Sequence, residues 1–96
     1  MSEELPQSLI LVFESYSREK FGLDVTESFL REFLEQLVDR KGMWSLVHEN
    51  LLSRRQFVQL LCTHVYDLLR RESAVEPEHE EDFSPLENAA EAALFG

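Results

Sequence analysis

The residues with the most obvious capacity for chemistry are Cys62 and His64, which lie two positions apart in the stretch LLCTHVY. A cysteine beside a histidine is a common arrangement for a nucleophile, and both side chains also bind zinc. Two steps along a helix turn a side chain by about 200°, so one helix cannot aim both groups at one ion or substrate. The other histidines, His48 and His79, fall in different segments. We therefore expect Cys62 to fill the core and predict no zinc site.

The sequence also lacks the patterns of other common sites. Its three glycines form no glycine-rich loop of the kind that binds phosphate. The acidic residues between Glu76 and Asp82 lack the alternating aspartates and the glycine of a calcium-binding loop. We interpret them as a solvated segment, with attraction to a basic surface as the functional alternative. We predict that the protein is not an enzyme and holds no cofactor and no metal.

Size and composition indicate one small globular domain. The chain has 96 residues, of which 44% are apolar and 10% aromatic, enough for a packed core. A single cysteine excludes an intramolecular disulfide and is typical of a reducing compartment. The N-terminal stretch MSEELPQS is acidic, and no apolar run reaches the roughly 20 residues of a membrane span. We predict a soluble protein of the cytoplasm or nucleus, without membrane insertion.

Charge is distributed unevenly along the chain, whose formal net charge is −10. Residues 1–71 hold eleven acidic and nine basic residues, whereas residues 72–96 hold eight acidic residues and no Lys or Arg. Binding to nucleic acid or to an anionic membrane surface requires clustered positive charge. We therefore predict that neither is a partner.

The first two helices are indicated by apolar residues at helical spacing. The first is predicted from Pro6 to Lys20, with Gly22 as its stop, although the run LILVF (9–13) also allows a strand. The second is predicted to follow a capping box over Asp24–Glu27 and to end at Arg40–Gly42.

Two more helices are predicted over Met43–Leu52 and Arg54–Glu72, separated by a second capping box at Ser53–Gln56. One long kinked helix is the alternative. Arg54 and Arg55 lie at a helix N-terminus, where cations are unfavourable, which suggests that they pair with the acidic tail. Arg70–Arg71 lie at the end that the helix dipole favours.

The last segment, SPLENAAEAALFG, begins with a third predicted capping box, Ser84 to Glu87, with Pro85 at the first helical position. A helix of about ten residues is not stable alone in water, so it must pack on the bundle, a twin subunit or a partner's groove. Ser84–Pro85 also resembles a proline-directed phosphorylation site.

The predicted fold class is all-α: a small bundle of four helices plus a short C-terminal helix after an acidic linker. We divide the chain into a helical bundle domain (1–72), the acidic linker (73–82) and a short amphipathic C-terminal segment (83–96).

Three helices carry more apolar surface than one inward stripe needs, and such faces often meet a second copy or another protein. We therefore predict a non-enzymatic protein–protein interaction module, a homodimer or an adaptor subunit of a hetero-complex. A monomer with a filled core and a small acidic chaperone that holds a client in an apolar groove are the alternatives. The predicted partner-binding residues are Leu9, Val12, Phe13, Tyr16, Phe29, Phe33, Trp44, Phe83, Leu86 and Leu94. For Trp44, core packing is the competing interpretation.

Six residues of the first two predicted helices share a spacing with a known motif: Leu9, Phe13, Tyr16, Phe29, Leu30 and Glu32. They resemble the LisH motif, a two-helix unit that dimerises, over a quarter of the chain. The resemblance implies a dimerisation adaptor of the centrosome, the cilium or a ubiquitin-ligase assembly. The chain has Phe21 where the family has a glycine, and Ser17 where it has an apolar residue. The opening LPQSLILVFESY is also similar to the dimerisation and docking domain of cyclic-AMP-dependent kinase regulatory subunits, although that family's Pro-Asp is absent.

Overall fold

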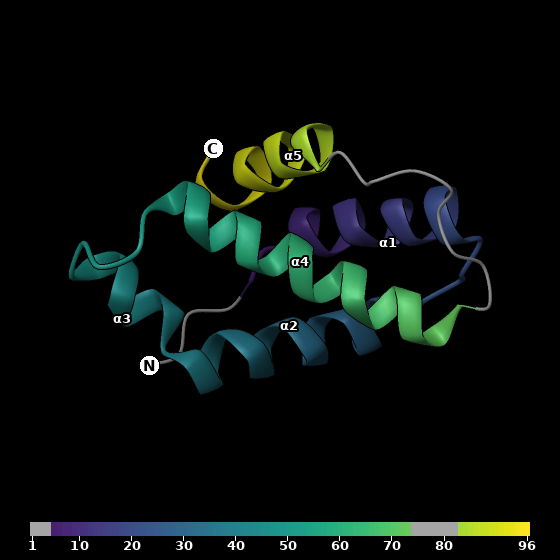
Figure 1. Cartoon of the computed structure of the whole chain (residues 1–96), viewed down its shortest axis with the longest axis horizontal. Coiled ribbons are helices and arrows are strands. Elements are labelled where there is room, and N and C mark those ends of the chain that lie inside the picture. Colours follow the sequence, from purple (N-terminus) through teal and green to yellow (C-terminus); the bar gives the residue numbers. More distant parts are fainter. Residues whose placement is uncertain (1–4, 74–82) are drawn as a thin grey trace.

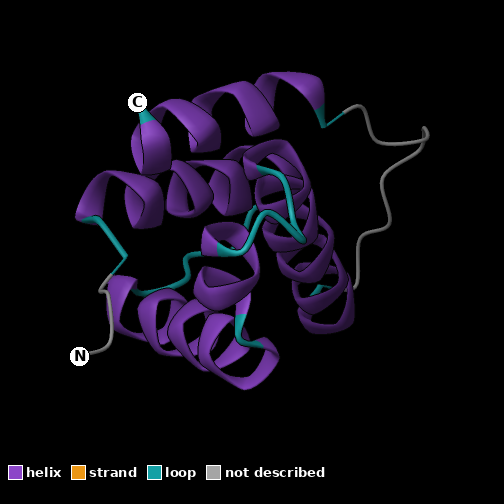
Figure 2. Cartoon of the chain, turned by 90° about the vertical axis from the view of Figure 1, so that its left-hand side faces the viewer, coloured by secondary structure: helices purple, strands orange, loops and turns teal. Residues whose placement is uncertain are grey.

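A computed structural model describes residues 5–73 and 83–96. These ranges form five helices: α1 (Gln7–Phe21), α2 (Glu27–Lys41), α3 (Met43–His48), α4 (Arg54–Glu72) and α5 (Ser84–Phe95). The described ranges contain helices and loops and no strand (Figure 2). The prediction of a small all-α bundle with a short C-terminal helix is confirmed. Most of the predicted acidic linker, 74–82, lies outside the described residues.

Helix α1 is packed on several sides, which explains its wide apolar surface. It contacts α2, α4 and α5, and Leu9, Ile10 and Phe13 are completely buried. Only Leu11 in the LILVF run is well exposed, at 42%. A helix surrounded by three others needs apolar residues on more than one face, so this run is explained by contacts within the chain. The alternative of a strand is wrong.

Helix α2 begins later than its sequence suggested. The prediction that Asp24 caps it is wrong, because the N-cap is Thr26, whose Oγ1 accepts a hydrogen bond from the Phe29 amide at 3.2 Å. Gly22 ends α1 in the left-handed conformation at φ 65°, and the chain then needs residues up to Thr26 to turn toward α2. Asp24 therefore stays in the loop, where its side chain is 95% exposed.

Helix α3 is shorter than predicted, since it ends at His48 and not at Leu52. Asn50 adopts a positive φ of 59°, a conformation that asparagine tolerates better than most residues and that interrupts a helix. The predicted capping box that starts α4 is confirmed: Gln56 N donates to Ser53 Oγ at 3.1 Å, and Ser53 N donates to Gln56 Oε1 at 3.0 Å. The alternative of one long kinked helix is therefore wrong.

Helix α5 docks on its own bundle. It contacts α1 and α4, and Figure 1 shows it on one side of α4, with α2 on the other side. Leu86 and Ala90 are buried and join the same core cluster as residues of the other four helices. The predicted third capping box is wrong, because the N-cap is Phe83, which has no acceptor side chain, and Ser84 is already helical. The Glu87 carboxylate pairs with an arginine of α4 instead of turning back to the helix start.

Candidate functional site

Cys62 is a core residue, and its thiol is unreactive at neutral pH. It is completely buried, and burial raises the pKa of its thiol to about 12, with the negative charge of Glu87 adding to the effect and Arg55 opposing it. The thiolate is the reactive form of cysteine, so this thiol is protonated and unreactive at neutral pH. The expectation that Cys62 fills the core is confirmed. In the two described ranges, no three His, Cys, Asp or Glu residues come together in a group able to hold a metal ion; His79 lies outside those ranges.

The predicted partner-binding residues fall into three groups in the structure. Leu9, Phe13, Tyr16 and Leu86 are buried in the chain's own core, so they offer no surface to a partner in this conformation. A second group is partly buried and packed against that core: Val12, Phe33, Trp44, Phe83 and Leu94. Phe29 alone of the ten is exposed, at 47%. The structure therefore does not bring the ten together on one outer face.

Trp44 belongs mainly to an internal aromatic cluster. Its ring centroid lies 4.9 Å from that of Phe57 and 6.2 Å from that of Phe95. The rings of Phe57 and Phe95 meet edge to face at 5.7 Å, a favourable geometry for aromatic pairs. This cluster joins α3, α4 and the end of α5, so it supports the competing interpretation of Trp44 as a packing residue.

Arg55 holds α5 against α4. Its Nη2 lies 3.1 Å from Glu87 Oε1 and its Nη1 lies 3.7 Å from Glu91 Oε2; Nη1 also donates to Asn88 Oδ1 at 3.1 Å. The guanidinium carbon of Arg54 lies 5.3 Å from the centre of the Phe95 ring, within cation–π range. The prediction that these two arginines pair with the acidic C-terminal part is confirmed for Arg55, whereas Arg54 lies over the Phe95 ring.

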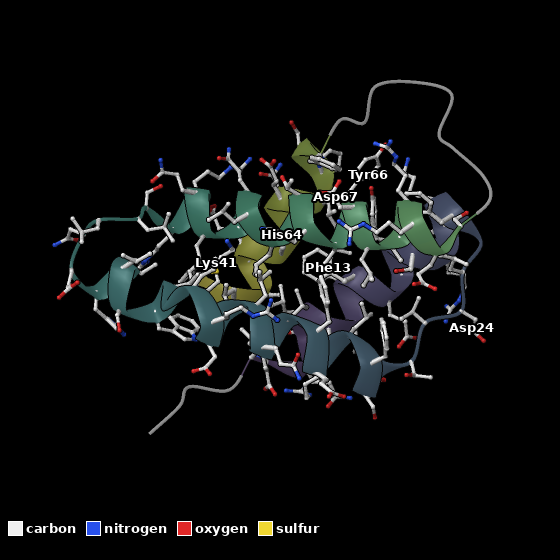
Figure 3. The ribbon with its side chains drawn as sticks, turned by 60° about the horizontal axis from the view of Figure 1, so that its bottom comes forward. Phe13, Asp24, Lys41, His64, Tyr66 and Asp67 are labelled. Carbon is white, nitrogen blue, oxygen red and sulfur yellow. The ribbon has the colours of Figure 1, made fainter. Side chains whose placement is uncertain are left out.

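A groove of about 330 Å³ lies at the turn between α1 and α2, and we call it the α1–α2 groove. It is lined by Leu23, Asp24, Val25, Thr26, Phe29 and Glu72. Four lining residues come from the loop, one from the first turn of α2 and one from the end of α4. In Figure 3, Asp24 lies at this end of the molecule and Lys41 toward the other.

The local fold explains why Phe29 remains at the surface. Its amide is engaged by Thr26 at the start of α2, and the next residue, Leu30, is completely buried. Successive helical residues are separated by about 100°, so turning Leu30 into the core places Phe29 on the flank of the helix. Phe33 lies one turn later and is partly buried against the core. The flank of α2 therefore carries two aromatic residues, of which Phe29 lines the groove.

The rim of the α1–α2 groove is negative. Asp24 and Glu72 line it, and no Lys or Arg does. Asp24 is paired with Arg18, whose Nη2 lies 3.9 Å from Asp24 Oδ1 and 3.1 Å from Glu14 Oε1. Arg18 is thus shared between two carboxylates, and at 3.9 Å it compensates Asp24 only weakly.

Sequence reasoning identified Phe29 but missed the rest of the groove. Leu23 and Val25 are apolar residues in a predicted loop, which is the one signal that could have indicated them. Glu72 comes from a helix 43 or more positions further along the chain than the other lining residues. Its presence there depends on tertiary packing, for which the sequence carries no local pattern.

Comparisons with known proteins found no match to this chain among family models, curated proteins or solved structures. No helix within residues 5–73 and 83–96 has the length and apolar character needed to cross a membrane.

Proposed function

We propose that this chain is a non-enzymatic protein–protein interaction module that binds a partner through Phe29 and the α1–α2 groove. The observation that carries the proposal is the 47% exposure of Phe29 beside a preformed groove. Aromatic residues in pockets are enriched among the side chains that dominate binding energy. Leu11 and Leu51 are also exposed but do not line this groove, so Phe29 is the best candidate anchor.

Burial energies set the scale of such a contact. Fully burying a phenylalanine side chain is worth about 1.5–3 kcal/mol, and roughly half of that remains available from a ring that is 47% exposed. This gain is too small to hold a complex alone, because association has its own entropic cost. Leu23 and Val25 in the groove, and Phe33 on the adjacent flank, supply further apolar contact.

A role outside catalysis is supported by the state of the best chemical candidate. Burial keeps the Cys62 thiol protonated, with its pKa raised to about 12, and the Glu87 carboxylate that acts on this pKa is paired with Arg55. We also propose that the protein works in the cytoplasm or nucleus. Its single cysteine supports this, because a chain without an intramolecular disulfide is typical of a reducing compartment.

Dimerisation of the LisH type is less favoured by the packing. Leu9 and Phe13, which carry that resemblance, are completely buried in the chain's own core, so a dimer formed through them would have to open the contacts of α1. A chaperone would bind many unfolded clients with little selectivity. The proposed module binds a defined partner through one anchor.

The test compares the intact protein with two matched variants, Phe29→Gln and Leu51→Gln, by quantitative affinity capture from cell extract. Leu51 is the control because it is 70% exposed and lies in the α3–α4 loop, at the opposite end of the molecule from the α1–α2 loop (Figure 1). We expect a small set of proteins to be lost with Phe29→Gln and retained with Leu51→Gln. Identical sets for all three proteins would contradict the proposal, and many unfolded clients would favour the chaperone.

A further inference from the structure

The α1–α2 groove combines a small apolar floor with carboxylates at its rim. Leu23, Val25 and Phe29 supply the apolar surface, and Asp24 and Glu72 supply the charge. A volume of about 330 Å³ is at the lower end of ligand pockets. It has room for one or two bulky side chains and not for a large cofactor.

Helix geometry adds to the negative character of the rim. Glu72 is the last residue of α4, and the C-terminal end of a helix carries a partial negative charge from its free carbonyl groups. Arg70 and Arg71 lie in the same last turn but do not line the groove. The start of α2 is capped by Thr26 and carries Glu27 in its first turn, which offsets the positive end of that helix.

We propose that the α1–α2 groove binds a basic segment of another protein, with one bulky apolar side chain packed beside Phe29 and Lys or Arg side chains paired with Asp24 and Glu72. This inference rests on the proposed function and specifies the chemistry of the partner. Apolar anchoring gives the affinity, and the charges at the rim give orientation and a fast approach.

Charge complementarity distinguishes this partner from other occupants of the groove. A second copy of the chain carries the same net charge of −10, so it would add like charge at an acidic rim. An acidic peptide meets the same repulsion. A basic segment gains from both the local carboxylates and the net charge of the whole chain.

The test is a selection of random 16-residue displayed peptides on the full-length protein, with the Phe29→Gln protein used to remove peptides that bind elsewhere. We expect the surviving peptides to be net positive and to share one bulky apolar residue. Survivors that are neutral or acidic on average would overturn the inference about the partner while leaving Phe29-dependent binding, and so the proposed function, intact. If no peptide depends on Phe29, the inference fails, and the affinity capture then decides the proposed function separately.

The best surviving peptide is then measured by fluorescence anisotropy against matched variants. We expect Phe29→Gln to weaken binding about 3- to 10-fold, and the double variant Asp24→Asn/Glu72→Gln to weaken it by a similar factor with a smaller dependence on salt. Leu51→Gln should leave the affinity unchanged. An Asp24→Asn/Glu72→Gln protein with unaltered affinity and salt dependence would show that the basic residues of the peptide do not pair with Asp24 and Glu72, and would overturn the proposal. Circular dichroism verifies that each variant is folded. The Asp24 side chain is 95% exposed, so we expect its replacement to leave the fold intact.

Discussion

Arg55 of α4 and Glu87 of α5 form an ion pair with 3.1 Å between Nη2 and Oε1, and this pair joins parts of the chain 32 positions apart. The Glu87 side chain is only 14% exposed, so loss of its partner leaves a carboxylate in a poorly solvated place. The charges of both residues also act on the pKa of the buried Cys62 thiol, which Glu87 raises and Arg55 lowers. The attachment of the C-terminal helix and the chemistry of the single cysteine are therefore linked.

Replacement of this arginine, Arg55→Gln, should lower the free energy of unfolding by about 1 kcal/mol. The change removes the ion pairs to Glu87 and Glu91, and partly exposed pairs are typically worth a few tenths to 1 kcal/mol each. Urea denaturation followed by circular dichroism measures the change. The control is Arg18→Gln, whose side chain is 60% exposed in its pair with Glu14 and should cost no more than about 0.5 kcal/mol. Equal effects of the two changes would argue against a role for Arg55 in holding α5.

Cys62 should react slowly with thiol reagents in the folded protein. Its pKa is raised from 9.0 to about 12 and it is completely buried, so both the thiolate fraction and the access of reagent are reduced. At pH 8 we expect labelling at least about a hundredfold slower than in the urea-unfolded chain. Arg55→Gln removes a charge that lowers the pKa of Cys62, so any faster labelling of this variant would come from looser contact of α5 with α4 and easier access of the reagent. Native labelling as fast as in urea would show that Cys62 is not covered.

The raised pKa of the Cys62 thiol predicts that the free energy of unfolding depends on pH. The folded pKa of about 12 lies above the ordinary 9.0, so the unfolded chain loses this proton first as the pH rises. The stabilising contribution is fully present below about pH 9 and is lost progressively toward pH 12. We expect the free energy of unfolding to fall more steeply above about pH 9 in the natural protein than in Cys62→Ala. Parallel curves for the two proteins would contradict the raised pKa.

The start of α2 provides a test of which residue caps it. Thr26→Ala should cost about 1 kcal/mol, the usual value for loss of an N-cap side chain, because its Oγ1 accepts from the Phe29 amide. Asp24→Ala should change stability by less than about 0.5 kcal/mol, since this side chain is 95% exposed. Thermal and urea unfolding measure both. A larger loss for Asp24→Ala than for Thr26→Ala would mean that the helix begins two residues earlier in solution.

Local patterns in the sequence were sufficient for the helices but not always for their ends. The Ser53–Gln56 capping box was recognisable because both of its hydrogen bonds are formed by side chains three residues apart. Asp24 and Thr26 both offer an oxygen to a helix start, and only Asp24 has a Glu three positions later. The choice of Thr26 depends on how many residues the chain needs to turn after Gly22, which local patterns do not encode.

The distribution of apolar residues was recognisable in the sequence, but their partners were not. Leu9 and Phe13 belong to a wide apolar surface that fits either a second protein or a helix from the same chain. Docking of α5 beside α1 supplies the intramolecular partner, and this contact joins the two ends of the sequence. The α1–α2 groove likewise depends on Glu72 arriving beside the loop. Long-range packing therefore determined which of the predicted contact residues stayed at the surface.

Removal of α5, by ending the chain at Ser73, should convert a compact protein into a loosened and self-associating one. The deletion removes the buried Leu86 and Ala90 and uncovers the faces of α1 and α4 that α5 contacts. The free energy of unfolding of a protein domain is of the order of 5 to 15 kcal/mol, and small domains lie near the lower end because they bury less surface. We expect lower urea resistance, binding of a dye for apolar surfaces, and a concentration-dependent increase in mass by light scattering. A synthetic peptide of residues 83–96 added in trans should reverse these changes, since it restores the ion pairs to Arg55 as well as the apolar cover. A truncated chain that stays monomeric and as stable as the full chain would show that α5 contributes little to the core.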